Sequence, residues 1–213
     1  SHRVTDVTAT LYYRPKDVRA AFGKGERYGV RMRYQEEAVQ MGTAGGVLLA
    51  GAHVKGTFLV LSGDGLTDCD LSDALKFHKE KGALATLVVK RVPVPLAYGL
   101  VLTDEGGRIK RFIEKPGWRQ AYSGLCNTGL YILERRLLDA IPEGVPYDFG
   151  KQLFPALLEK GEKLYAYETP GYWCDVGDQA AYRRAQRDLM AGKVRVALPD
   201  CVRISDGAWR DAS

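Results

Sequence analysis

The sequence predicts an α/β fold built on a doubly wound, mostly parallel sheet. Three observations support this prediction. Short apolar runs alternate with amphipathic helical segments through the first half of the chain, these runs are typical of strands buried on both faces, and turn residues separate the segments. The length of 213 residues suits one large domain, or one domain with a fragment of another.

The first fifty residues predict two strands and two helical segments. Val4–Tyr13 is predicted to be a strand, and Pro15 is expected to open a helix that ends near Phe22. Arg31–Tyr34 is predicted to form a second, short strand. The Gly- and Ala-rich segment Gly42–Ala50 is expected to turn and enter a helix.

The next segment places an acidic residue where ligands gather in this class of fold. Phe58–Ser62 is continuously apolar up to its last residue, which predicts a strand buried on both faces, and Asp64 follows it closely. Asp70 is predicted to cap the next helix, whose apolar face carries His78, and Ala83–Val89 is predicted to be another buried strand. Since ligands bind at the carboxyl ends of strands in doubly wound sheets, Asp64 is a candidate site residue and His78 a packed one.

The second half of the chain predicts a small mixed β lid over the sheet edge, followed by further core elements. Asp104 begins a predicted hairpin turn between the first two strands of this half. The predicted strands are Gly99–Thr103, Arg108–Glu114, Cys126–Leu133 and Lys163–Glu168, and the predicted helices are Phe149–Lys160, bent or started near Pro155, and Gln179–Ala191.

Composition excludes several classes of protein. The chain carries 31 basic and 26 acidic residues without a long block of one sign, which argues against a nucleic-acid partner. The +5 charge is best explained by a solvated surface with a mild basic excess, and a basic cleft for phosphorylated small molecules is the less favoured interpretation. No apolar run reaches the ~20 residues of a membrane span, and no secretion signal is seen. The four cysteines form no Cys-x-x-Cys pair, so we expect neither a zinc site nor a disulfide scaffold. The cysteine pattern instead favours a cytoplasmic location.

Several short motifs occur together in a characteristic order. They are Gly42-Thr43-Ala44-Gly45, Ser62-Gly63-Asp64, Phe112-Ile113-Glu114-Lys115-Pro116, Asn127-Thr128-Gly129, Asp148-Phe149-Gly150-Lys151-Gln152-Leu153-Phe154-Pro155 and Tyr172-Trp173-Cys174-Asp175-Val176-Gly177. In this order and spacing the chain resembles the sugar-1-phosphate nucleotidyltransferases from Val4 to about Lys193. The stretch that begins at Asp148 is similar to the bacterial mannose-1-phosphate guanylyltransferase branch.

The resemblance implies a fold, a domain division and a metal site. It implies a Rossmann-like sheet of the nucleotide-diphospho-sugar transferase type over residues 1–192, with 193–213 as a tail or the start of a truncated C-terminal domain. It assigns Mg²⁺ to Asp64 and Asp175, which would meet at one edge of the sheet. A hard divalent cation held by one or two carboxylates suits a reaction in which two polyanions must approach each other. Without the second motif, Asp64 is as well explained as a turn or helix-capping residue.

The resemblance also implies substrate contacts. Lys115 would bind the phosphate of a sugar 1-phosphate, which makes it catalytic together with the two aspartates. Because adjacent residues of an extended strand point to opposite faces, Glu114 and Lys115 can share one ligand only if the strand ends or twists there. The remaining substrate-binding residues are Glu114 and Asn127 at the sugar hydroxyls, Gly99 at a close backbone approach to the sugar, and Glu37, Gly42, Thr43 and Gly45 at the base.

Guanine is the base we expect, because the Glu37 carboxylate accepts hydrogen bonds from the N1 and N2 donors of that base. The similarity to the mannose-1-phosphate guanylyltransferase branch implies GTP and mannose 1-phosphate as partners, with glucose-1-phosphate thymidylyl- or uridylyltransferase as the enzymatic alternative. The family opens with a strand and a Gly-rich phosphate loop that nothing before Val4 matches. That leaves open an N-terminal segment supplied elsewhere, a homo-oligomer, or a non-catalytic nucleotide-sugar-binding regulatory subunit.

Overall fold

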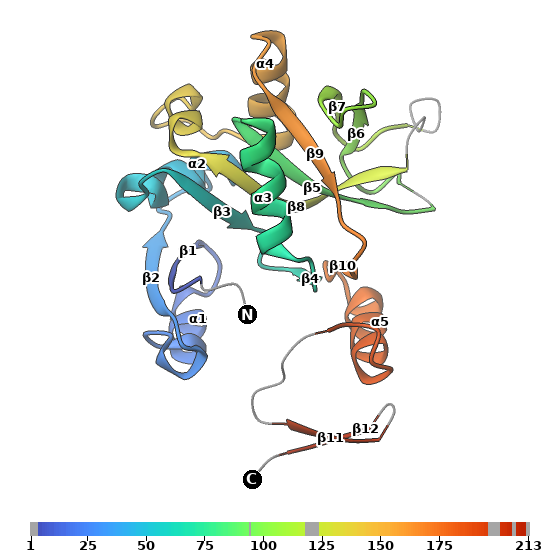
Figure 1. The fold of residues 1–213 in the computed structure, drawn as a ribbon. Helices are drawn as coiled ribbons and strands as arrows, with labels where there is room; N and C mark the ends of the chain where they lie inside the picture. The colour runs from blue at the N-terminus through green and yellow to red at the C-terminus, as the bar shows by residue number, and fades with distance from the viewer. Residues whose placement is uncertain (1–3, 94, 118–123, 196–200, 206–207, 212–213) are drawn as a thin grey trace.

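The computed structural model describes residues 4–93, 95–117, 124–195, 201–205 and 208–211 (Figure 1). The strands are β1 (Asp6–Leu11), β2 (Arg31–Glu36), β3 (Thr57–Leu61), β4 (Gly65–Thr67), β5 (Ala85–Arg91), β6 (Leu100–Thr103), β7 (Ile109–Ile113), β8 (Leu125–Glu134), β9 (Leu164–Glu168), β10 (Trp173–Asp175), β11 (Cys201–Ser205) and β12 (Ala208–Asp211). The α-helices are α1 (Pro15–Phe22), α2 (Gly42–Ala50), α3 (Leu71–Lys81), α4 (Phe154–Glu159) and α5 (Gln179–Met190). A π-helical segment, Phe149–Leu153, runs directly into α4.

The central sheet contains β3, β5, β6, β7, β8 and β9. Strands β5 and β9 pair in parallel, while β8 lies between β3 and β5 and runs antiparallel to both. The pairings therefore give β3, β5, β6 and β9 one direction and β7 and β8 the other. The α/β class predicted from the sequence is confirmed, and the position of the antiparallel β8 is a detail that the sequence did not predict.

Strands β1 and β2 form a separate parallel pair, in which Asp6 lies opposite Arg31 and Leu11 opposite Glu36. Strand β3 pairs on one edge with β8 and on its other edge with no strand that the structure describes. Its residues are half-buried, and Leu61 is 53% exposed. The segment Phe58–Ser62 is therefore less buried than predicted, although Phe58 and Val60 pack against one core cluster and Leu59 packs against another.

Helix boundaries follow local signals. Pro15 is the first residue of α1, as predicted from its fixed φ. The Asp70 carboxylate accepts hydrogen bonds from the backbone N–H groups of Ser72 and Asp73, and Gly82 ends α3 in the left-handed conformation. His78 is 1% exposed on the inner face of α3, which confirms that it is a packed residue.

The mixed β region predicted over the sheet edge corresponds to β6 and β7. They pair antiparallel across the Asp104 turn, whose side chain accepts hydrogen bonds from the N–H groups of Gly106 and Arg108. Strand β6 joins β8 through the Leu100–Cys126 pair, so this region continues the central sheet. Strands β11 and β12 pair antiparallel, and the division of the chain at residue 192 stays a prediction.

A cluster of aromatic side chains fills the core between the sheet and the π-helical segment. The ring centroids of Tyr131, Phe149 and Phe154 lie 5.1 to 5.4 Å apart, and Phe112 packs 5.6 Å from Phe154. Phe149 and Phe154 are almost fully buried. Burial of this apolar surface fixes the segment Phe149–Leu153 against β7 and β8.

The side chains of three of the four cysteines lie in the described part of the chain. Cys69, Cys126 and Cys174 are buried free thiols. The side chain of Cys201 lies outside the described part of the chain. No helix in the described ranges is long and apolar enough to cross a membrane.

Candidate active site

The structure brings together the two aspartates that are more than one hundred positions apart in the sequence. Asp64 follows β3, and Asp175 is the last residue of β10. Strands β10 and β4 pair antiparallel with Asp175 opposite Gly65, and the N–H of Val176 donates to the Asp64 carbonyl at 2.9 Å. These contacts bring the backbone at Asp64 and Asp175 together, and Figure 1 shows β4 and β10 side by side.

The electrostatics of this pair favour a cation. Burial, the charge of Asp64 and the charge of Asp178 together raise the pKa of the Asp175 carboxyl. Asp64 is exposed, and its Oδ1 accepts a hydrogen bond from the Ser62 hydroxyl at 2.6 Å. Neither aspartate forms an ion pair with a basic residue of the described chain. Two neighbouring carboxylates without a basic partner are a donor set that suits a hard divalent cation.

The pair supplies two carboxylates and no more. Within the described ranges, no group of three histidine, cysteine or acidic side chains is placed to hold a metal. Mg²⁺ is commonly bound by one or two carboxylates, with water and substrate phosphate oxygens as its other ligands. The residues present therefore fit Mg²⁺ bound together with a phosphorylated substrate, and they do not form a closed structural metal site.

A second cluster contains three of the predicted substrate-binding residues. The N–H of Asn127 donates to the Gly99 carbonyl at 2.8 Å, which joins β8 to the residue before β6. A Cβ on Gly99 would lie 2.9 Å from Glu114 Oε2 and 2.6 Å from the Phe112 ring. Gly99, Glu114 and Asn127 are thus neighbours, and a side chain at position 99 would displace Phe112 or the Glu114 carboxylate.

The backbone departs from a regular strand at Lys115. Strand β7 ends at Ile113, and Lys115 has φ 45°, in the left-handed region that non-glycine residues rarely adopt. The alternation of side chains across a strand therefore stops before Lys115. Glu114 is half-buried beside Gly99, whereas Lys115 is exposed.

Lys151 is a basic residue of this cluster that sequence reasoning did not assign to the site. Burial and the charge of Asp148 raise the pKa of Glu114, and the charges of Lys115 and Lys151 oppose that shift. Both lysines are exposed, and neither has an ion-pair partner among the described residues. The only sequence signal for Lys151 was its place in the motif that begins at Asp148.

Asn127 is oriented by the aromatic core. Its side-chain Nδ2 donates to the Tyr131 hydroxyl at 2.8 Å, and its Oδ1 accepts from the N–H of Gly129 at 3.3 Å. Burial is the largest cause of the raised pKa of Tyr131, which keeps that hydroxyl protonated. The neighbouring carbonyl, that of Thr128, accepts a hydrogen bond from Trp173 Nε1 at 3.1 Å. Trp173 of β10 therefore links the acidic pair to the strand that carries Asn127.

Residues predicted to contact the base hold another part of the site in place. Thr43 Oγ1 donates to Asp148 Oδ2 at 2.9 Å and accepts from the N–H of Phe149 at 3.0 Å. The N–H of buried Gly45 donates to the Tyr147 carbonyl at 3.0 Å. The start of α2 thereby fixes the segment from Tyr147 to Phe149, which leads to Lys151. The sequence did not predict this role.

Glu37 and Gly42 also have structural contacts. Glu37 Oε2 accepts a hydrogen bond from the N–H of Met41 at 2.9 Å, so this carboxylate stabilises the turn before α2. Gly42 has φ 72°, and a Cβ there would lie 2.5 Å from the Tyr147 carbonyl oxygen. Contact of Glu37, Gly42, Thr43 and Gly45 with a base stays a prediction.

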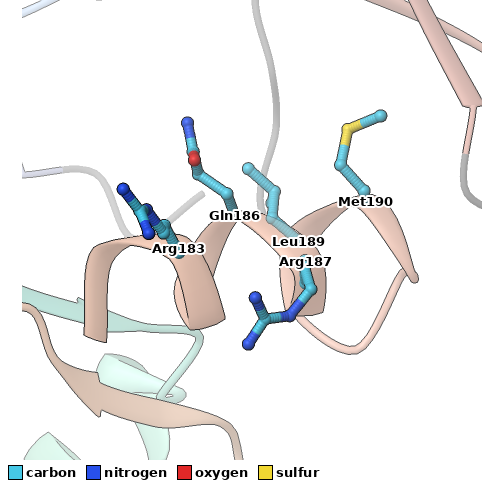
Figure 2. A pocket seen from close by; sticks show the side chains of 5 residues that line it. All are labelled: Arg183, Gln186, Arg187, Leu189 and Met190. Atoms are coloured by element: carbon cyan, nitrogen blue, oxygen red, sulfur yellow. The ribbon is translucent and has the colours of Figure 1, made fainter. Parts of the chain in front are cut away.

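A hollow of about 600 Å³ lies on α5 and is separate from these clusters (Figure 2). It is lined by Arg183, Gln186, Arg187, Leu189 and Met190. All five come from one helix, and none is a residue predicted from the sequence. Side chains from a single helix face do not enclose a small ligand, so this hollow is a weaker candidate than the acidic pair.

Comparison with protein families identifies the family of the chain. The family model described as nucleotidyl transferase matches residues 1–192. The chain belongs to this nucleotidyl transferase family. The match covers the acidic pair, the Glu114 cluster and the motif that begins at Asp148, which confirms the resemblance drawn from the sequence.

Two curated relatives carry different specificities. The UTP–glucose-1-phosphate uridylyltransferase of Synechocystis sp. is 36% identical over 213 residues, covering 93% of this chain and 55% of that protein. The mannose-1-phosphate guanylyltransferase of Mycobacterium tuberculosis is 37% identical over 182 residues, covering 84% of this chain and 50% of that protein. The chain thus spans about half the length of the curated relatives it matches.

Solved structures share the fold of this nucleotidyl transferase chain. The crystal structure of HddC from Yersinia pseudotuberculosis matches with a TM-score of 0.75 at 20% identity, covering 86% of this chain and 78% of that one. HddC complexed with GMP-PN matches with a TM-score of 0.71, covering 84% and 76%. These similarities support the α/β nucleotide-sugar transferase fold.

Proposed function

We propose that this chain is the catalytic core of a sugar-1-phosphate nucleotidyltransferase, with GTP and mannose 1-phosphate as substrates and GDP-mannose and pyrophosphate as products. The observation that carries the proposal is the proximity of Asp64 and Asp175, where Asp175 pairs with Gly65 and the N–H of Val176 donates to the Asp64 carbonyl. Membership of the nucleotidyl transferase family supports the reaction class. A cytoplasmic location belongs to the same proposal.

In the proposed reaction, an oxygen of the sugar phosphate attacks the α-phosphorus of the nucleoside triphosphate in line. A P–O bond forms to the α-phosphorus, the bond from that phosphorus to the β-bridging oxygen breaks, and pyrophosphate leaves with the electron pair. Bound between Asp64 and Asp175, Mg²⁺ would neutralise phosphate charge. Repulsion between the two polyanions is the main barrier that the protein must lower.

The chain's own residues would position the sugar phosphate. Lys115 and Lys151 are exposed cations whose charges act on the half-buried Glu114, and they would bind the phosphate oxygens. Glu114 and Asn127 would hydrogen-bond sugar hydroxyls, and the backbone at Gly99 would approach the ring. Such positioning makes the attack effectively intramolecular.

The choice of GTP is the finer part of the proposal. It is supported by the acceptor character of Glu37 and by the similarity to mannose-1-phosphate guanylyltransferases. The similarity to a uridylyltransferase supports glucose 1-phosphate and UTP, or dTTP, as the alternative pair. A non-catalytic nucleotide-sugar-binding subunit is the second alternative, and it requires no pyrophosphate release.

Pyrophosphate release tests the function directly. The purified protein is incubated with Mg²⁺ and each pairing of GTP, UTP or dTTP with mannose 1-phosphate or glucose 1-phosphate. We expect release to be at least tenfold faster with GTP and mannose 1-phosphate than with any other pair, and to stop when EDTA is added. Faster release with UTP would assign the alternative activity, and tight nucleotide-sugar binding without release would assign the regulatory role.

Replacement of Gly99 by alanine is expected to weaken sugar 1-phosphate binding. The new Cβ would lie 2.6 Å from the Phe112 ring and 2.9 Å from Glu114 Oε2, so the Glu114 side chain must move. We expect KM for the sugar 1-phosphate to rise about tenfold, with KM for the nucleotide unchanged. Gly106→Ala is the control for the substitution type, because Gly106 has no left-handed φ and the nearest atom to a Cβ there, Asp104 Oδ1, lies at 3.4 Å. An unchanged KM in Gly99→Ala would remove Glu114 from the sugar site.

A further inference from the structure

The loop Thr169–Tyr172, between β9 and β10, is anchored by a lysine that has no role in the proposed reaction. Lys90 Nζ donates to the carbonyls of Thr169 at 3.3 Å, Pro170 at 3.2 Å and Gly171 at 2.6 Å. These three bonds match the three N–H donors of an ammonium group. Lys90 is half-buried at the end of β5, and its contacts are all to this loop rather than to a carboxylate.

Asp68 anchors the same loop from another side. Its side chain is 3% exposed, and its carboxylate accepts hydrogen bonds from the N–H groups of Tyr172 at 2.6 Å and Arg195 at 2.9 Å. Burial opposes ionisation of Asp68, but these hydrogen bonds outweigh it and lower its pKa. A Cβ on Gly171 would collide with Asp68 Oδ1. The fit is therefore tight, and the buried acceptor is charged, which strengthens its hydrogen bonds.

Strand β10 follows this loop directly. It is three residues long and pairs with β4, and Tyr172 immediately precedes it. Thr67 Oγ1, at the end of β4, donates to the Tyr172 carbonyl at 2.8 Å. Since Asp175 lies only three residues after Tyr172, a shift of the loop moves β10 and changes the separation of Asp175 from Asp64.

We propose that Lys90 and Asp68 are positioning residues, which hold the loop Thr169–Tyr172 and thereby set the place of the Asp175 carboxylate opposite Asp64. This inference rests on the proposed function for the role of Asp175. Neither residue touches the substrate. Their effect is on the geometry of the cation site, and therefore on the Mg²⁺ dependence of turnover more than on sugar binding.

Lys90→Met tests the proposal, because methionine has a similar length and no hydrogen-bond donor. We expect the Mg²⁺ concentration for half-maximal turnover to rise about tenfold, with KM for the sugar 1-phosphate unchanged. Lys90→Arg keeps N–H donors and should recover most of the loss. Lys79→Met is the matched control, because Lys79 is exposed on α3 and has no ion pair in the described part of the chain.

A second readout does not depend on activity. Trp173 lies in β10 and donates its indole N–H to the Thr128 carbonyl, so its ¹H–¹⁵N resonance reports the position of that strand. Trp173→Phe assigns the resonance among the three tryptophans. We expect the resonance to shift in Lys90→Met, to stay near its original place in Lys90→Arg, and not to move in Lys79→Met.

The two proposals fail separately. If Lys90→Met keeps both the original Mg²⁺ dependence and the original Trp173 resonance, the positioning role is wrong. If the unmodified protein releases no pyrophosphate with any substrate pair, the proposed function fails, and the Trp173 resonance alone decides whether Lys90 holds β10. If Lys90→Met does not fold, Asp68→Asn replaces it. This variant loses one of the two carboxylate acceptors and should change both readouts in the same direction.

Discussion

Asp175→Asn is expected to reduce the rate of pyrophosphate release about a thousandfold at saturating substrate. The asparagine keeps the size of the side chain and removes the charge that faces Asp64, so the cation loses one of its two carboxylate ligands. Loss of the charge stabilisation that a bound metal provides is worth several kcal/mol of transition-state energy, and about 4 kcal/mol corresponds to this factor. The rate is measured over a range of Mg²⁺ concentrations.

Glu143→Gln is the control for this substitution, because Glu143 is exposed and has no charged partner in the described ranges. It should leave the rate unchanged. Unchanged turnover in Asp175→Asn would remove that residue from the mechanism, together with the cation site that the acidic pair defines.

The same substitution is expected to stabilise the fold when no divalent cation is present. The folded pKa of Asp175 is raised above 3.8, the ordinary value for an aspartate, so folding favours the protonated form. The preference of the folded state for the protonated carboxyl stabilises the fold fully below the ordinary pKa. This stabilisation is lost as pH rises through the folded pKa. At neutral pH the ionised carboxylate therefore costs stability, and the neutral asparagine avoids that cost.

Melting temperatures measured in EDTA check this expectation. Asp175→Asn should melt at a higher temperature than the unmodified protein at pH 7, and the difference should shrink as pH falls through the raised folded pKa. A lower melting temperature at pH 7 would mean that the carboxylate has a stabilising partner. A stability gain at the expense of activity is the usual behaviour of functional residues.

Lys115→Met is expected to have the second-largest effect. Removing a charged hydrogen-bond donor to a phosphate costs about 1.5–3 kcal/mol, so kcat/KM for the sugar 1-phosphate should fall roughly 10- to 100-fold. KM for the nucleotide should change little. Initial rates at varied sugar 1-phosphate concentrations measure the effect, and Lys55→Met, an exposed lysine outside the cluster, is the control.

Lys151→Met extends the same test to the residue found only in the structure. We expect a smaller loss of kcat/KM for the sugar 1-phosphate than in Lys115→Met. In the double variant, the loss in free energy should differ from the sum of the two single losses, because both charges act near Glu114. If Lys151→Met binds sugar 1-phosphate as well as the unmodified protein, the phosphate site contains Lys115 without it.

Local signals in the sequence were sufficient for several elements. The bounds of α1 and α3 follow from Pro15, Asp70 and Gly82, because caps and φ restrictions act within one turn of the chain. The turn before Arg108 follows from its glycines and Asp104. The short strands β4 and β10 were not predicted as elements, because three residues carry no periodicity and each strand exists only through pairing with the other.

By itself, the sequence determined the α/β class, the packed position of His78 and the set of chemical groups offered by the motifs, Asp64 and Asp175 among them. The resemblance also implied that Asp64 and Asp175 meet, but only the tertiary structure decided the contacts that bring such groups together. It placed Asp175 beside Asp64 through pairing across more than one hundred positions, brought Lys151 near Glu114, and directed Lys90 to carbonyls about eighty positions away. Contacts of this kind depend on how distant strands pair and how loops close. The residues next to each contact in the chain do not indicate which distant segment it will meet.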